Sequence, residues 1–308
     1  MPEYWRIRVI VGNTEDRTRD AWNRDEVGVW YGASTAQDCI DALVQNNVTP
    51  ANYLWNLPAN RALNWDITDG FFRPLVRFTQ IPVGDWAVVF FRETQQIGIA
   101  QICSIIQSDE NHLLNLNGEI FKFRKLCNKR IFRLSHLPGA YHLLPGWGFG
   151  NVNRINGLQK HVSLLIQSQT EADVSRALRA MPHNDLLDFL GAAEWESFCT
   201  AYLIIEEGFV PTGLSTGRAL PVVDIVGRRR GDGSRIYAQC KKDPNSQEVS
   251  NEFRALCSTL AARDTAYFFA YGGCHGNREN ITVFDRDCAQ RWVATENGRR
   301  YIELFTAA

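Results

Sequence analysis

The feature that most constrains the fold is a change in hydrophobic periodicity near residue 167. Before this point, apolar residues form short runs separated by turn residues, most clearly residues 86–91 and 97–102, which follow Pro82, Gly84 and Asp85. After it, apolar residues recur at helical spacing in two segments that alternate with strand-like runs. One regular architecture does not produce both patterns, so the sequence predicts two domains.

The boundaries follow from these patterns. Residues 1–168 predict a β-rich barrel of the α+β class with one helix near residues 34–46. Residues 169–184 are polar and compatible with a helix, which is typical of a linker, and residues 185–308 form the second predicted domain. The length of 308 residues is about twice the commonest domain size.

The second domain has a defined order of predicted elements. Its first helix carries Trp195, Phe198, Cys199 and Tyr202 at i, i+3, i+4 and i+7, and Gly208 follows in the position of a C-terminal cap. The remaining predicted elements are a short strand near residue 209, strands 222–227 and 236–241, a helix over 249–260, and strands 266–271 and 281–284. The order helix, three strands, helix, strand predicts an α/β core.

Composition excludes several classes of protein. Hydrophobic residues make up 45% and charged residues 22%, as in folded globular proteins. The apolar runs fall short of the roughly 20 residues that a membrane span needs, and the start of the sequence has no signal-peptide pattern. We therefore expect a cytoplasmic protein without a membrane partner. The eight cysteines contain no CxxC pair and predict buried thiols instead of disulfides or a zinc site.

Charge alone does not indicate a nucleic-acid partner, because the formal net charge is −1. Two local basic runs stand out, residues 122–133 and Arg228–Arg230 with Arg235 nearby. Basic runs are more often solvated surface than binding sites, so neither run by itself indicates a nucleic-acid-binding function.

A chemically specific pattern lies on the two central strands of the second domain. Side chains alternate along a strand, so Gln239 and Lys241 share one face and Cys240 points to the other. If Gly231 and Asp232 form a two-residue turn, Asp224 lies opposite Gln239; a turn one residue later places it opposite Lys241. A three-residue loop would instead place Asp224 opposite Cys240 in the ladder. Both two-residue turns gather a carboxylate, an amide and an ammonium on one face.

Such a set suits phosphodiester hydrolysis, which uses oxygen ligands for a divalent cation and a lysine near the phosphate. The stretch of residues 221–227, followed by Ala238-Gln239-Cys240-Lys241, resembles the PD-(D/E)xK nuclease superfamily. Glutamine in place of the usual acid is similar to its Mrr-type branch, and residues 193–198 resemble the opening helix of that branch, with Glu196 as the matching carboxylate. The resemblance covers roughly residues 187–304.

The resemblance implies a role for each matching residue. Asp224 would bind the metal, Glu196 would assist, and the backbone carbonyl of Cys240 would be a further ligand. Lys241 would stabilise phosphoryl charge or orient water. Mg²⁺ is the expected metal, with Mn²⁺ as a substitute, and the neutral Gln239 implies weaker binding than in a site with two acids.

Other interpretations of these residues remain open. Asp224 and Lys241 are also of types that are common on protein surfaces, and Glu194 competes with Glu196 for the role on the helix. Lys242 and Arg228–Arg230 are candidate phosphate contacts or solvated residues, and His275 follows the fourth strand in a loop without an assigned role.

The first domain resembles PUA-like domains of the EVE kind, through Tyr4-Trp5-Arg6-Ile7, residues 28–32 and residues 82–91. This resemblance implies a pocket for a flipped or modified base, walled by aromatic side chains. The candidate pocket residues are Trp30, Tyr31, Trp86 and Trp147, although most aromatic residues of such a barrel fill its core.

Together the two resemblances imply a modification-dependent, type IV-like restriction endonuclease that cuts modified duplex DNA. Cleavage of both strands would require two chains. Two alternatives remain: a nuclease gated by a small ligand or a partner in a defence complex, and a nucleic-acid-binding module that has lost catalysis.

Overall fold

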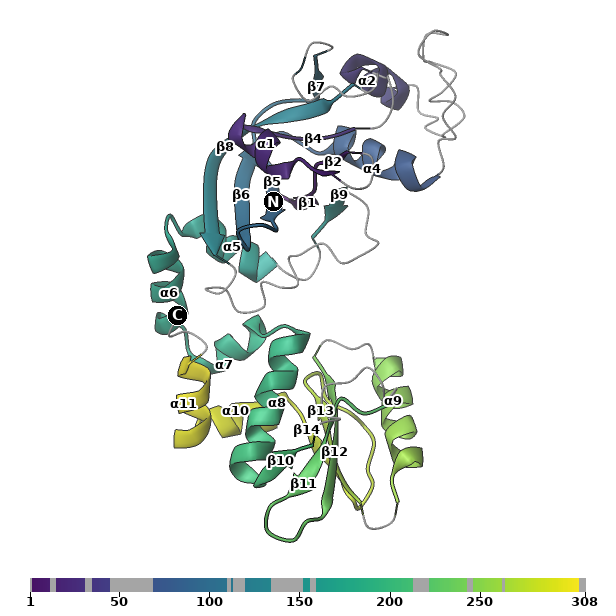
Figure 1. Cartoon of the computed structure of the whole chain (residues 1–308), viewed down its shortest axis with the longest axis vertical. Coiled ribbons are helices and arrows are strands. Elements are labelled where there is room, and N and C mark those ends of the chain that lie inside the picture. Colours follow the sequence, from purple (N-terminus) through teal and green to yellow (C-terminus); the bar gives the residue numbers. More distant parts are fainter. Residues whose placement is uncertain are drawn as a thin grey trace. The chain divides into compact units, whose positions relative to one another are not determined.

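The computed structural model describes residues 2–11, 15–30, 35–44, 69–109, 112, 120–133, 152–155, 159–212, 222–242, 246–261 and 264–304. The chain is a mixed α/β protein whose internal contacts divide it into two compact units (Figure 1). Unit 1 comprises the described residues of Met1–Leu134 and His142–Glu171, and unit 2 those of Ala172–Ala308. No helix within these residues is long and apolar enough to cross a membrane.

Unit 1 is built on a curled seven-stranded sheet with the order β4-β8-β6-β5-β1-β9, in which β7 also pairs with β8 (Figure 1). The strands are β1 (Tyr4–Ile7), β2 (Ile10–Val11), β3 (Glu15–Asp16), β4 (Glu26–Val29), β5 (Trp86–Phe91), β6 (Gln96–Ile102), β7 (Gln107–Ser108), β8 (Lys122–Arg133) and β9 (Val152–Arg154). The helices are α1 (Thr18–Asn23), α2 (Ala36–Val44), α4 (Asp69–Gln80) and α5 (Gln159–Gln167). The predicted antiparallel pair over residues 86–102 is confirmed as β5 and β6.

Unit 1 contains more helix than the sequence predicts. Only α2 was expected, and α4 was missed although its side chains Leu75 and Phe78 are buried in the core. Pro74 lies inside α4, and an internal proline is ordinarily evidence against a helix. The helix nevertheless ends against Arg124, whose guanidinium donates to the carbonyls of Phe78 and Thr79.

The basic run at residues 122–133 is not an open basic patch. It forms the long strand β8, whose alternation turns Lys122 and Arg124 inward, where they are 0% and 3% exposed. Burial lowers the pKa of Arg124 to about 10. Lys129 pairs with Asp25 at 2.6 Å, and Arg130 donates to carbonyls at the end of α5. Arg124, Lys129 and Arg130 therefore interact with groups of unit 1 itself.

The expectation that all cysteines are free thiols is wrong at one pair, because Cys103 and Cys127 form a disulfide. They lie 24 residues apart, and β6 meets β8 where Gln101 pairs with Cys127, so strand pairing brings the two sulfurs together. The other six cysteines are thiols, and Cys39 and Cys199 among them are buried.

Unit 2 is a five-stranded sheet between helices, with the order β10-β11-β12-β13-β14. The strands are β10 (Phe209–Pro211), β11 (Ile225–Arg229), β12 (Arg235–Lys241), β13 (Thr265–Ala270) and β14 (Ile281–Phe284). The helices are α6 (Glu171–Ala180), which starts at the end of unit 1, α7 (His183–Leu186), α8 (Ala192–Glu206), α9 (Ser246–Thr259), α10 (Arg286–Val293) and α11 (Glu296–Leu304), with a 3-10 turn at Leu187–Phe189. The predicted order of elements is present, and residues 169–184, predicted as a linker, contain α6.

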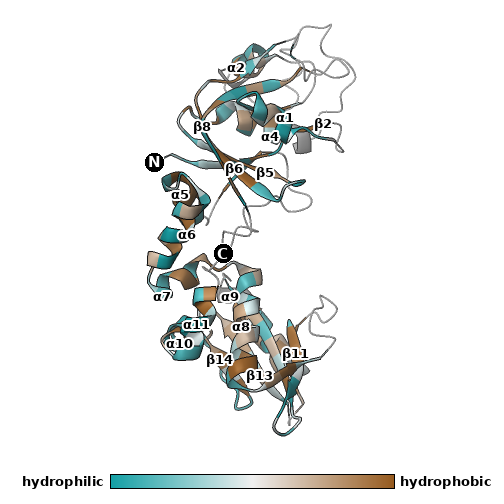
Figure 2. Cartoon of the chain, turned by 60° about the vertical axis from the view of Figure 1, so that its left-hand side comes forward, coloured by the Kyte–Doolittle hydropathy of each residue, from teal (hydrophilic) through white to brown (hydrophobic). Residues whose placement is uncertain are grey.

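Helices α8 and α9 lie on opposite sides of this sheet (Figure 1). The apolar stripe of α8 packs on one face, where Tyr202 contacts Phe269 and Phe284. The apolar stripe of α9 packs on the other face, where the rings of Phe253 and Phe268 meet edge to face with 5.3 Å between their centroids. Strands β13 and β14 are therefore hydrophobic along most of their length, whereas α10 is mainly hydrophilic (Figure 2).

Candidate functional site

The β11–β12 hairpin sets the register of the candidate site. Its ladder pairs Ile225 with Ala238 and Arg228 with Arg235, which is the register predicted from a turn at Gly231 and Asp232. The tip is wider than a two-residue turn, since the Arg229 N–H donates to the Ser234 carbonyl and the Gly233 N–H to that of Arg229, each at 2.9 Å. Continued by one residue, the same register places Asp224 opposite Gln239.

Asp224 lies just before β11, in a bend instead of the expected strand. Its backbone N–H donates to the Ala238 carbonyl at 2.9 Å, and its Oδ2 accepts from the Cys240 N–H at 2.7 Å. The carboxylate thus takes the place of a missing strand residue at the end of the ladder. In an extended strand the carbonyl points to the same side as the N–H of its residue, so we expect the Cys240 carbonyl to point toward Asp224 as well.

Strand β12 turns alternate side chains toward α8 and α9, as predicted. Gln239 pairs in register with Phe268, which packs on Phe253 of α9, so Gln239 and Lys241 face α9. Cys240 faces the other way, toward Cys199 on α8, and burial raises the pKa of both thiols. Gln239 is only 3% exposed, and its Oε1 finds no hydrogen-bond partner in the part of the chain that the structure describes.

Lys241 and Asp224 interact through their charges. Burial raises the pKa of Asp224, while the hydrogen bond from Cys240 and the charge of Lys241 partly oppose that rise. The Lys241 ammonium donates to Glu252 Oε1 of α9 at 3.2 Å. Sequence reasoning missed Glu252; the available signal was its place beside Phe253, at the edge of the apolar stripe that faces the sheet.

The two acids at the start of α8 have different roles. Glu194 Oε2 accepts from the Gly191 N–H at 3.1 Å and so caps the helix. Burial, and then the charge of Asp224, raise the pKa of Glu196, so the two carboxylates interact through their charges. Of the two candidates, Glu196 is therefore the one that interacts with the strand residues.

The remaining candidates of unit 2 lie outside this group. Lys242 is buried on the α8 side, where its ammonium donates to the Leu187 carbonyl at 2.8 Å and lies 3.0 Å from the centre of the Tyr271 ring. It is therefore not an exposed phosphate contact. Arg228 donates to the Gly233 carbonyl, Arg229 pairs with Glu207 at 2.9 Å, and His275 is exposed.

The aromatic candidates of unit 1 are only partly placed. Tyr31 and Trp147 lie outside the described residues. Trp30 is 3% exposed, its ring lies 4.8 Å from that of Phe121, and its Nε1 has no partner among the described residues. Trp86 begins β5, and β8 and β6 separate that strand from β4 in the sheet. The two tryptophans are therefore not neighbours along the sheet.

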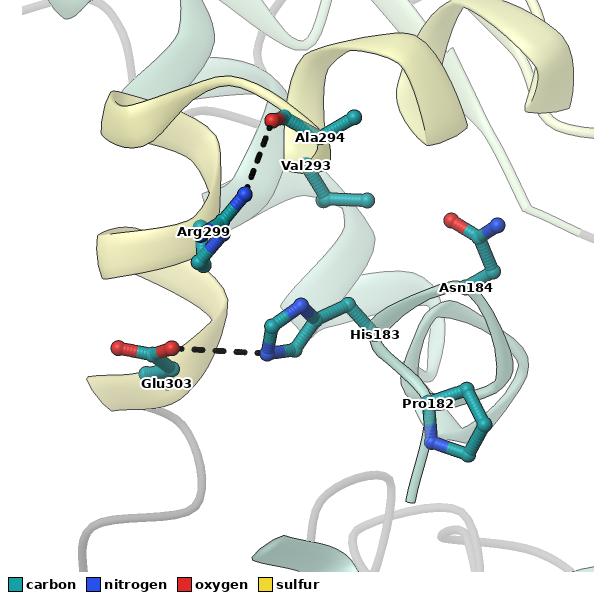
Figure 3. Close-up of a pocket in the computed structure, with 7 residues that line it drawn as sticks. All are labelled: Pro182, His183, Asn184, Val293, Ala294, Arg299 and Glu303. Atoms are coloured by element: carbon teal, nitrogen blue, oxygen red, sulfur yellow. Dashed lines mark hydrogen bonds and ion pairs between the residues drawn. The ribbon is translucent and has the colours of Figure 1, made fainter. Parts of the chain in front are cut away.

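A separate pocket lies between α7, α10 and α11 (Figure 3). Its volume is about 460 Å³, and none of its lining residues belongs to the predicted site. His183 points toward Glu303, with 3.5 Å between Nε2 and Oε1, and Arg299 donates to the Ala294 carbonyl (Figure 3). His183 and Arg299 therefore each have a partner within the lining of the pocket.

The oxygens around Asp224 fit a hard divalent cation better than a soft one. Asp224 and Glu196 repel each other, and Gln239 Oε1 is buried without a donor among the described residues, so a cation would relieve both costs. No three His, Cys, Asp or Glu side chains form a metal-binding group in the described ranges. A cation here would therefore also need the Gln239 amide or backbone oxygens.

Comparison with protein-family models, curated proteins and solved structures finds no match for this chain.

Proposed function

We propose that this chain is a metal-dependent endonuclease that cleaves DNA carrying modified bases. The observation that carries the proposal is that Asp224 Oδ2 accepts from the N–H of Cys240, the residue between Gln239 and Lys241, at the end of the β11–β12 ladder. In this proposal unit 2 is a PD-(D/E)xK core of the Mrr type, and unit 1 is a PUA/EVE-like reader.

Each residue has a distinct task in the proposed reaction. Asp224, Gln239 and the Cys240 carbonyl would hold a magnesium ion, with Glu196 adding negative charge. The bound ion would neutralise charge on the scissile phosphate and lower the pKa of a bound water. Lys241 would donate to a phosphate oxygen and stabilise the charge that develops there.

The reader role of unit 1 is supported by Trp30. A buried indole N–H without a partner is costly, and a ligand that accepts a hydrogen bond would satisfy it. Extraction of a base from the stack costs a few kcal/mol, which aromatic contacts and hydrogen bonds can offset.

The test is a cleavage assay on matched duplexes that differ only in base modification, with magnesium and with a chelator. We expect magnesium-dependent cleavage of the modified duplex alone, and only a small residual rate of cleavage by Asp224→Asn or Lys241→Met. Asparagine retains an oxygen that can accept from Cys240, so Asp224→Asn should remain folded. Equal cutting of both duplexes would reject the reader function of unit 1.

The same assay separates the alternatives. Cleavage only after addition of a nucleotide or a protein partner would indicate a gated effector. Tight DNA binding without products in magnesium, manganese and calcium would indicate a binding module, an alternative that the neutral Gln239 favours.

A further inference from the structure

Glu252 of α9 is the one acid whose carboxylate is hydrogen bonded to Lys241 in the described part of the chain. The distance from Lys241 Nζ to Glu252 Oε1 is 3.2 Å, and the side chains are 21% and 26% exposed. The packing of α9 fixes this arrangement, because the next residue, Phe253, is buried against Phe268 of β13.

Lys241 has no anionic neighbour on its own face of β12. The residue two positions earlier, Gln239, is neutral, and its Oε1 has no hydrogen-bond partner among the described residues. A lysine side chain is a flexible stem with a compact charge, so an ammonium without a fixed partner samples many positions. Glu252 supplies the partner from the neighbouring helix.

Both members of the pair interact with Asp224 through their charges. The charge of Lys241 lowers the pKa of Asp224, and the charge of Glu252 raises it. The ammonium that Glu252 binds is thus near enough to affect Asp224, whose Oδ2 accepts from the N–H of Cys240, the residue before Lys241.

We propose that Glu252 is a positioning residue that holds the Lys241 ammonium beside Asp224, in place of the carboxylate that Gln239 does not provide. This inference rests on the proposed nuclease function. It assigns to α9 a role that the predicted motif residues do not include.

The first test compares Glu252→Gln with a matched control, Glu279→Gln, at an exposed position of the same unit. We expect kcat to fall by about 10- to 100-fold in Glu252→Gln, since small misplacements of a reacting group have effects of this size. We expect KM and the dependence on magnesium concentration to change little, Glu252→Asp to recover part of the rate, and Glu279→Gln to match the wild type.

A double-mutant cycle shows whether Glu252 acts through Lys241. Addition of Glu252→Gln to Lys241→Met should cause no further loss of residual activity. A further loss equal to that in the wild-type background, or a wild-type rate in Glu252→Gln, would overturn the inference and leave the nuclease proposal intact.

The second test does not depend on cleavage. Competitive acetylation of the full-length protein, followed by mass spectrometry, measures the reactivity of each lysine. We expect Lys241 to react several-fold faster in Glu252→Gln, while the buried Lys242 is unchanged. An unchanged rate at Lys241 would overturn the inference, whereas the absence of cleavage by the wild-type chain in every metal would overturn the nuclease function itself.

Discussion

At the scale of single residues, Lys241, the last residue of β12, and Lys242, which follows it, have opposite environments. Lys241 donates to Glu252 on the α9 side, and Lys242 is buried on the α8 side over the Tyr271 ring. Tyr271 in turn donates to Asp188 at 2.6 Å, and Arg286 pairs with the same carboxylate. One lysine therefore belongs to the candidate site and the other to the packing of the unit.

Substitution should separate these two roles. Lys242→Met removes the charge-assisted hydrogen bond to the Leu187 carbonyl, and we expect a loss of about 1–3 kcal/mol in unfolding free energy. Lys241→Met should change that free energy by less than about 0.5 kcal/mol, as is usual for partly exposed positions. Urea denaturation followed by circular dichroism measures both. Equal urea midpoints for the two variants would contradict this assignment.

Asp224 predicts a dependence of stability on pH. Because burial raises its pKa in the folded state, the folded protein binds this proton more tightly than the unfolded chain. The stability that Asp224 contributes is therefore present below its unfolded pKa, about 3.9, and is lost as pH rises through the higher folded value.

We accordingly expect metal-free Asp224→Asn to be more stable than the wild type at pH 8 and to lose that advantage near pH 4. Thermal unfolding in chelator at both pH values tests this. Magnesium should raise the melting temperature of the wild type only. A variant that is less stable than the wild type at pH 8 would show that the raised pKa has no net effect on folding.

At the scale of elements, Gly227 of β11 allows β10 to approach. A Cβ at this position would overlap the Phe209 ring and the Val210 carbonyl, whereas one at Gly231 in the hairpin tip would meet nothing within 4 Å. We expect Gly227→Ala to cost about 1–3 kcal/mol and Gly231→Ala to be nearly neutral. The measurement is the urea midpoint of each variant, and an equal effect of both would refute the steric argument.

The sequence predicted α8, α9 and the strands of unit 2 because their signals are local, whereas α7, α10 and α11 were not among the predicted elements. The stripe of α8, the Gly208 cap with its φ of +61° and the apolar strands β13 and β14 all follow from short-range spacing. The register of β11 and β12 was also predictable, since a hairpin tip limits the choices.

The features that the sequence did not predict depend on contacts between distant segments. Helix α4 forms despite Pro74, and Arg124 binds its last carbonyls from 44 or more residues away. The disulfide of Cys103 and Cys127 depends on the pairing of β6 with β8. In the candidate site, Glu252 was missed because its relation to Lys241 depends on how α9 packs across the sheet.

At the scale of the whole molecule, each unit has a hydrophobic core of its own. The core of unit 1 gathers Trp5, Trp22 and Phe78, and a core of unit 2 gathers Phe253, Leu256 and Phe268. Separate cores are expected to unfold as separate cooperative units.

Differential scanning calorimetry of the full chain should therefore show two transitions. Lys242→Met should lower the temperature of one transition and leave the other in place, because its contacts lie within unit 2. A single transition that moves as a whole would indicate that the two units unfold together.

The register of β11 and β12 also limits which insertions and deletions the hairpin tip at residues 230–233 can accept. An insertion or deletion of one residue that slides β11 by one position past β12 would place Asp224 opposite Ala238 or Cys240 instead of Gln239. A change of two residues would restore the same faces. Active relatives of this chain should therefore differ in the length of this tip by even numbers, unless a bulge compensates.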